Sequence, residues 1–95
     1  MHPRAVKLII RGRVQRVGYR AAVYGAISDK LPEISGYVKN LSNGDVEMHL
    51  QGEAHFIKKA IDIAYLGSRR CKVESIEVLE LTHNDKRYEN FIIES

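Results

Sequence analysis

The chain has 95 residues, a mass of 10.8 kDa and a formal net charge of +3, with 44% apolar and 28% charged residues. This length leaves room for one small core, so we expect residues 1–95 to form a single domain. No apolar run approaches the ~18 residues of a membrane span, and the alternating N-terminus is unlike a secretory signal. The single cysteine, Cys71, excludes an internal disulfide and a thiolate zinc cluster. We expect a cytoplasmic protein that has no membrane partner.

The spacing of the apolar residues predicts the secondary structure in chain order. Alternation of apolar and polar residues is typical of strands, and apolar residues three and four apart are typical of amphipathic helices. The patterns predict a strand, a helix, two strands, a helix and two strands, over residues 5–12, 20–32, 35–41, 46–50, 53–66, 73–81 and 91–93. Asn43 and Gly44 favour the positive φ angles of a tight hairpin between the second and third strands. The polar segment 83–87 is predicted to be a turn.

The first six elements follow the order βαββαβ, the split β-α-β arrangement of ferredoxin-like folds. We therefore predict an α+β sandwich in which an antiparallel sheet carries both helices on one face. The second strand is expected beside the first. Modules that recognise RNA, small regulatory domains and small hydrolases share this topology, so the fold alone does not predict the function.

Positive charge is concentrated in the N-terminal third of the chain. Residues 1–30 contain seven lysines and arginines against one acidic residue, whereas the later residues carry a small excess of acids. This asymmetry predicts a bound anion near the N-terminal third, which is a phosphate, a carboxylate or a nucleic-acid backbone. Ordinary solvated surface charge is the alternative.

The loop at residues 12–20 joins the first predicted strand to the first predicted helix. A loop that leads into a helix directs backbone N–H groups and the positive end of the helix dipole at one spot. Arg20 opens the helix and can present its guanidinium to two phosphate oxygens at once. The loop is therefore a candidate cradle for one phosphate, with a solvated basic loop as the alternative. Asn40, expected near its mouth, offers an amide that can accept a hydrogen bond from water and donate one to a substrate.

These two segments resemble the two signature motifs of the acylphosphatase family. The first motif, Gly-x-Val-Gln-Gly-Val-x-Phe-Arg, is matched by Gly12, Val14, Gln15, Val17 and Arg20. The second motif begins with Gly-aromatic-x-x-Asn, continues after three residues with Gly-x-Val, and ends with a further glycine. It is matched by Gly36, Tyr37, Asn40, Gly44, Val46 and Gly52. The chain departs from the first motif at Arg16, where the family usually has glycine, and at Tyr19, where it has phenylalanine.

The resemblance implies a hydrolase that cleaves the carboxyl–phosphate bond of acyl phosphates to give a carboxylate and inorganic phosphate. It implies that Arg20 binds the phosphoryl group together with backbone N–H groups of residues 15–20, and that Asn40 orients the attacking water. The loop residues in this cradle are Gln15, Arg16, Val17, Gly18 and Tyr19. The resemblance also implies that no metal or organic cofactor is used. We therefore interpret the chain as a monomeric enzyme of this kind.

Two alternatives belong to other classes of function. A nucleic-acid-binding module of this topology stacks bases on aromatic residues in its central strands, but the first and third predicted strands contain none, so we expect no nucleic-acid partner. The second alternative is a catalytically impaired regulatory module that binds phosphate or acyl phosphate. Arg16 would be the cause, either by straining the loop if its φ is positive or by slowing the release of phosphate.

Overall fold

The computed structural model describes residues 4–81 and 87–94. The elements are β1 (Arg4–Arg13), α1 (Tyr19–Lys30), β2 (Ser35–Asn40), β3 (Val46–Gly52), α2 (Ala54–Leu66), β4 (Lys72–Glu80) and β5 (Phe91–Glu94). The predicted order of strands and helices is confirmed, and each end lies within a few residues of its expected place. The turn predicted at 83–87 lies outside the described residues except for its last position.

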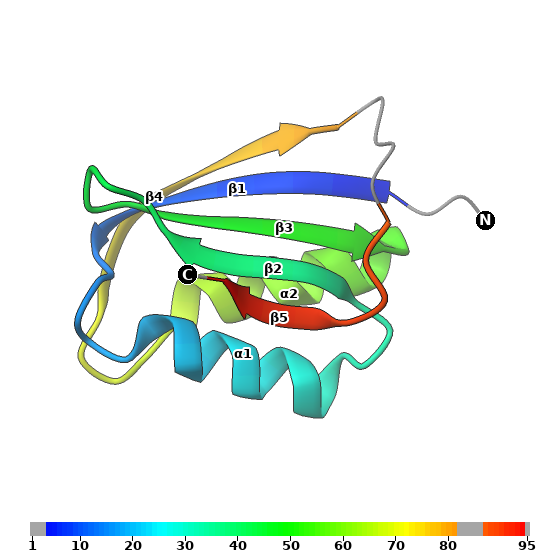
Figure 1. Ribbon diagram of the computed structural model, residues 1–95, viewed down its shortest axis with the longest axis horizontal. Coiled ribbons are helices and arrows are strands. Elements are labelled where there is room, and N and C mark those ends of the chain that lie inside the picture. The colour runs from blue at the N-terminus through cyan, green and yellow to red at the C-terminus, as the bar shows by residue number, and fades with distance from the viewer. Residues whose placement is uncertain (1–3, 82–86, 95) are drawn as a thin grey trace.

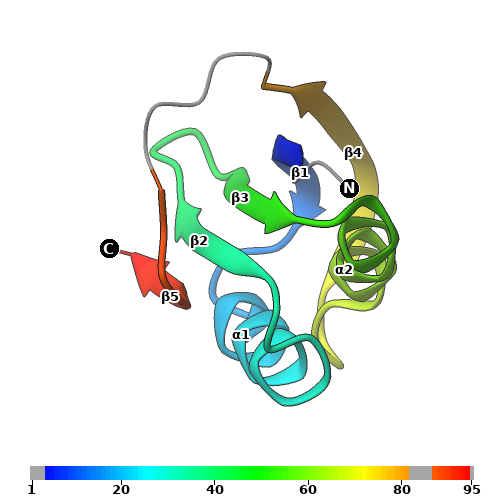
Figure 2. The ribbon, with the colours of Figure 1, turned by 90° about the vertical axis from the view of Figure 1, so that its right-hand side faces the viewer.

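The strands form one sheet in the order β4-β1-β3-β2-β5 (Figure 1). Both helices lie on one face of this sheet, as predicted (Figure 2). The four strands of the βαββαβ unit pair antiparallel throughout, as predicted. β5 adds a parallel pair with β2, so the whole sheet is mixed. The prediction that β2 lies beside β1 is wrong, because β1 pairs on its two sides with β3 and β4.

The parallel pair lies at the edge of the sheet. β4 is one edge of the sheet and β5 is the opposite edge. β5 starts at the end of the sheet where β4 finishes and runs in the direction of β2 (Figure 1). Short apolar strands are compatible with either direction of pairing, and the sequence pattern of 91–93 does not distinguish them.

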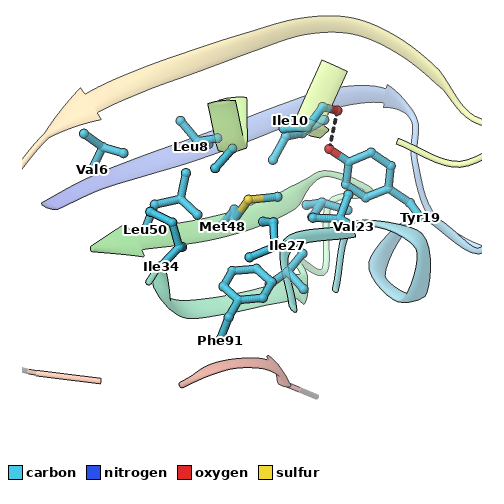
Figure 3. Close-up of a cluster of buried hydrophobic side chains, with 14 of the residues drawn as sticks. Val6, Leu8, Ile10, Tyr19, Val23, Ile27, Ile34, Met48, Leu50 and Phe91 are labelled. Carbon is cyan, nitrogen blue, oxygen red and sulfur yellow. Dashed lines mark hydrogen bonds between the residues drawn. The ribbon is translucent and has the colours of Figure 1, made fainter. Parts of the chain in front are cut away.

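The core lies between the helices and the face of the sheet that they cover (Figure 3). Alternate residues of β1 and β3 are fully buried there, and the predicted apolar stripes of the two helices pack against them. The sheet contributes Val6, Leu8, Ile10, Met48 and Leu50, and the helices contribute Val23, Ile27, Ile57, Ala60 and Ala64. Burial of each large apolar side chain stabilises the fold by about 1.5–3 kcal/mol. This packing fixes the position of α1 relative to the ends of the strands.

Tyr19 connects the start of α1 to the end of α2. Its ring is only 1% exposed, and its hydroxyl donates a hydrogen bond of 2.6 Å to the carbonyl oxygen of Ala64 (Figure 3). A Cβ atom at Gly67 would lie 2.6 Å from the Tyr19 ring, so the ring fills the space that this glycine leaves. Burial raises the pKa of the Tyr19 hydroxyl, which therefore stays protonated and able to donate. The hydroxyl that distinguishes Tyr19 from phenylalanine thus has a buried partner.

The turn between β2 and β3 differs in detail from the predicted hairpin. Gly44 has a positive φ of 97°, as expected, but Asn43 does not. Instead, the side-chain oxygen of Asn43 accepts a hydrogen bond of 3.0 Å from the backbone N–H of Asp45. The N–H of Leu41 donates to the carbonyl of Asp45 at 2.8 Å and closes the loop. The side chain of Asn43 stabilises the turn, so one left-handed residue is enough.

Replacement of Tyr19 by phenylalanine tests the link between the helices. Tyr19→Phe keeps the ring and leaves the buried Ala64 carbonyl without its donor, so we expect the free energy of unfolding to fall by about 1 kcal/mol. Urea denaturation measures this difference. Tyr24→Phe is the matched control, because Tyr24 lies on the same helix and is 40% exposed; its effect should stay within about 0.5 kcal/mol. Equal effects of the two changes would contradict a structural role for the Tyr19 hydroxyl.

Candidate active site

Segments that are far apart in sequence meet at one end of the sheet. The loop after β1, the start of α1 and the ends of β2 and β5 lie together at the left of Figure 1. A cavity of about 210 Å³ opens between them, and its walls include residues from all of these segments. The lining residues are Val14, Arg16, Gly18, Tyr19, Arg20, Ala21, Asn40 and Ile93. The structure therefore brings Arg20 and Asn40 to one cavity although 20 positions separate them in the chain.

The loop after β1 reaches α1 through two left-handed residues. Arg16 has φ 62° and Gly18 has φ 78°. Arg16 is the one non-glycine residue with positive φ among residues 4–81 and 87–94. A side chain in this conformation costs roughly 1–2 kcal/mol relative to glycine, because Cβ approaches the following carbonyl oxygen. The family's usual glycine at this position is thus explained by the backbone, and the chain tolerates an arginine in the same conformation.

The backbone N–H groups of residues 15–20 are available as donors. Within the described part of the chain, none of them donates to a backbone carbonyl, and the helical hydrogen bonds begin with the N–H of Ala22, which donates to the carbonyl of Gly18 at 3.0 Å. The first turn of α1 contains no acidic residue that would neutralise the positive end of the helix dipole. Free donors and an uncompensated dipole favour the binding of an anion at this point.

Arg20 is held in place by the edge strand. Its side chain is half-buried, and Nη1 donates a hydrogen bond of 3.1 Å to the backbone carbonyl of Glu94 at the end of β5. This contact uses one of the five N–H donors of the guanidinium and leaves the others for a ligand. A carbonyl partner orients the guanidinium without neutralising its charge, so Arg20 is a cation prepared to bind an anion.

Asn40 is the last residue of β2, and it carries an unsatisfied polar atom. Its Oδ1 atom is buried and has no hydrogen-bond partner among the described residues. A buried acceptor without a partner costs about 1–3 kcal/mol, and such atoms usually bind water or a ligand. Asn40 lines the same cavity as Arg20, so its amide lies beside the place where an anion bound to Arg20 would sit.

The side chain of Gln15 joins the two halves of the site. Its amide nitrogen donates to the carbonyl of Leu41 at 2.7 Å and to the carbonyl of Asp45 at 2.8 Å. The loop that carries the free N–H groups is thereby connected to the turn that directly follows Asn40. Sequence reasoning placed Gln15 in the loop for its backbone N–H and missed this use of the side chain. The two partners lie 26 and 30 positions away, and no local pattern in the sequence relates them.

The remaining predicted loop residues have different surroundings. Val17 is buried in the core and does not line the cavity. Gly18 and Tyr19 line the cavity, but the Tyr19 hydroxyl is bound to Ala64. Among the described residues there is no group of three or more metal-ligating His, Cys, Asp or Glu side chains. Neither α1 nor α2 is long and apolar enough to span a membrane.

Comparison with known proteins identifies the family. The acylphosphatase family model matches residues 6–93. The chain belongs to the acylphosphatase family. The acylphosphatase of Methanocella arvoryzae is 38% identical over 78 residues, which cover 82% of this chain and 86% of that protein. The acylphosphatase of Caldanaerobacter subterraneus is 34% identical over 90 residues, which cover 95% and 97%. The crystal structure of the Bacillus subtilis acylphosphatase superposes with a TM-score of 0.87 at 28% identity, covering 97% of this chain and 99% of that one.

A substitution at Gln15 tests whether its amide holds the two loops together. Gln15→Met keeps the length of the side chain and removes both donors, so two partly buried carbonyls lose a partner. We expect the free energy of unfolding to fall by about 1–2 kcal/mol. We also expect faster hydrogen exchange at the Leu41 N–H, whose acceptor, the Asp45 carbonyl, is one of these two. Urea denaturation and amide exchange measured by NMR check the two effects.

Gln15→Glu is the matched variant, because the carboxylate has nearly the same shape but cannot donate when ionised. It should behave like Gln15→Met or worse, since a negative charge would then face two carbonyl oxygens. If both variants keep the wild-type stability and exchange rates, the amide does not hold the turn.

Proposed function

We propose that this member of the family hydrolyses acyl phosphates, with Arg20 and Asn40 as its catalytic residues. The observation that carries the proposal is the cavity whose wall combines three features: Arg20, the loop residues with free N–H groups that line it, and Asn40, whose side-chain oxygen has no partner among the described residues. Arg20 and the N–H groups suit a phosphoryl group, and the Asn40 side chain suits a water molecule beside it. Family membership over most of the chain supports the same activity.

In the proposed reaction the oxygen of water attacks phosphorus and the bond from phosphorus to the carboxyl oxygen breaks. The electron pair of that bond leaves with the carboxylate. One proton of the water stays on the new P–OH group and the other moves to a phosphoryl oxygen. The dianionic acyl phosphate and water thus give a carboxylate anion and a dihydrogen phosphate anion, and atoms and charge balance.

The site needs little acid–base machinery for this step. A carboxylate leaving group has a conjugate-acid pKa of about 4, so it departs without protonation. The phosphoryl group itself can take up the proton of the water. Phosphoryl transfer is accelerated mainly by positioning and by stabilising the charge on the equatorial oxygens. Arg20 and the backbone N–H groups stabilise the charge on these oxygens. Asn40 positions the water by accepting a hydrogen bond from it.

We further propose that residues 1–95 act as one domain, as a cytoplasmic monomer without a cofactor. The second candidate function is a module of the same family that binds phosphate or acyl phosphate but turns it over poorly. The left-handed conformation of Arg16, which places a second cation in the cavity wall, is the observation that favours it. Binding of inorganic phosphate without turnover of any acyl phosphate would identify this case.

The decisive experiment is hydrolysis of benzoyl phosphate by purified protein in excess chelator, with Asn40→Ala as the test variant. Loss of the group that orients the water should lower kcat by about 10²–10³-fold, with a smaller effect on phosphate binding. Asn90→Ala is the control, because it removes the amide of an exposed asparagine that does not line the cavity. Its kcat should stay close to that of the wild type.

If Asn40→Ala keeps the kcat of the wild type, Asn40 does not orient the water. No turnover by the wild type, with inorganic phosphate still bound, would favour the impaired module over the enzyme.

Arg20 is tested by two substitutions. Arg20→Gln removes the charge, and Arg20→Lys keeps it but loses the planar pair of donors. We expect both variants to lose at least about 10²-fold in kcat/KM and to bind inorganic phosphate more weakly, because the phosphoryl group needs two parallel hydrogen bonds. Arg13→Gln, an exposed site at the end of β1 that does not line the cavity, controls for the loss of one positive charge. Wild-type turnover in Arg20→Gln would refute the role of Arg20.

A further inference from the structure

We propose that Arg16 forms a second anion subsite, which binds a negatively charged group on the acyl part of the substrate. The preferred substrates would then be acyl phosphates whose acyl chain carries a carboxylate or a similar anion. This inference rests on the proposed function, because it assigns the phosphoryl group to Arg20 and the loop. It goes further because it assigns the acyl part of the substrate to Arg16, where this chain departs from the family motif.

The charges on the cavity wall support this subsite. Arg16 and Arg20 both line the cavity, and no carboxylate is among the lining residues. In the neighbouring strand β1, Arg4 pairs with Glu80 and Arg11 pairs with Glu77 and Asp45, whereas Arg13 has no ion pair with a described residue. Arg16 has no ion pair with any described residue. The cavity wall therefore includes two arginines that form no ion pair with a described carboxylate.

The two arginines differ in how they are held. Arg20 is half-buried and bound to the carbonyl of Glu94, so its guanidinium has one fixed place in the wall. Arg16 is exposed and stands on a left-handed residue of the loop. An exposed arginine keeps a flexible stem and can reach ligand atoms of more than one geometry. Arg20, which is fixed, suits the phosphoryl group that every substrate shares. Arg16, which is exposed, suits the acyl part, which varies between substrates.

The cavity has room for more than a phosphoryl group. Its volume of about 210 Å³ is about seven times the ~30 Å³ that a water molecule occupies in the liquid. Val14, Ala21 and Ile93 give it an apolar share of wall, which suits the carbon atoms of an acyl group. A substrate held by its phosphoryl group at Arg20 would therefore place its acyl carbons along apolar side chains, with Arg16 as the remaining charged group on the wall.

A pair of matched substrates tests the subsite. 4-Carboxybenzoyl phosphate and 4-methylbenzoyl phosphate have similar shape and differ in charge at the far end of the ring. We expect the wild type to favour the carboxylated substrate in kcat/KM, and Arg16→Gln to reduce that preference by about fivefold, the value of one exposed ion pair. The ratio between the two substrates is the measured quantity, so a general loss of activity in the variant does not affect it.

Two controls separate local binding from general attraction. Arg13→Gln removes the same charge from a nearby exposed residue outside the cavity wall, and should leave the preference unchanged. Arg16→Lys should keep part of the preference, because it keeps the charge. The wild-type preference should also shrink as salt is raised from about 0.01 M to about 1 M, over which the Debye length falls from ~30 Å to ~3 Å.

The same comparison can be made without turnover. Phosphonates in which a CH₂ group replaces the bridging oxygen of the two substrates cannot be hydrolysed, and calorimetry gives their Kd for the wild type and for Arg16→Gln. A fivefold loss confined to the carboxylated phosphonate would support the subsite even if the protein hydrolysed neither acyl phosphate, in which case the proposed function alone would fail. An equal loss for both phosphonates, no loss for either, or no binding of either would overturn the inference.

Discussion

Two hydrogen bonds from one side-chain amide, of 2.7 and 2.8 Å, join the loop after β1 to the turn after β2, and the geometry of the cavity depends on them. On one side of this junction are the free N–H groups of residues 15–20. On the other side is Asn40, which ends β2 just before the turn. The sheet joins β1 to β2 through β3, where Val46 pairs with both Ile10 and Asn40, but these pairs do not include the loop of residues 15–20. The Gln15 amide makes this connection with both of its N–H donors.

The start of α1 is anchored on two sides, which fixes the position of its free donors. Tyr19 binds the carbonyl of Ala64 at the end of α2, and Arg20 binds the carbonyl of Glu94 at the end of β5. The two contacts point from adjacent residues to different parts of the fold. A helix that was held only by its apolar stripe would be free to shift along its axis by small amounts, whereas these polar contacts set its first turn.

The site retains features that would be unfavourable elsewhere in the chain. Arg16 has a left-handed backbone, Asn40 has a buried acceptor without a partner in the described residues, and the first turn of α1 has no acidic side chain. Each of these lowers stability by an amount on the order of 1 kcal/mol, and under the proposed function a bound anion and water molecule would offset the last two. Their concentration in one cavity, while the core is well packed, is typical of a binding site that is organised before the ligand arrives.

The amino-acid sequence by itself determined the elements, the ferredoxin-like sandwich and the family, because apolar periodicity and turn residues are local signals and the motif residues match in order. It also placed Arg20 at the first turn of a helix, which is a local property. Tertiary structure alone decided the neighbours of β2 and the parallel pairing of β5, since several strand orders satisfy the same apolar pattern. It also decided the partners of the Gln15 amide and the Tyr19 hydroxyl. These partners are backbone carbonyl oxygens, and because every residue has such an oxygen, the sequence does not distinguish them.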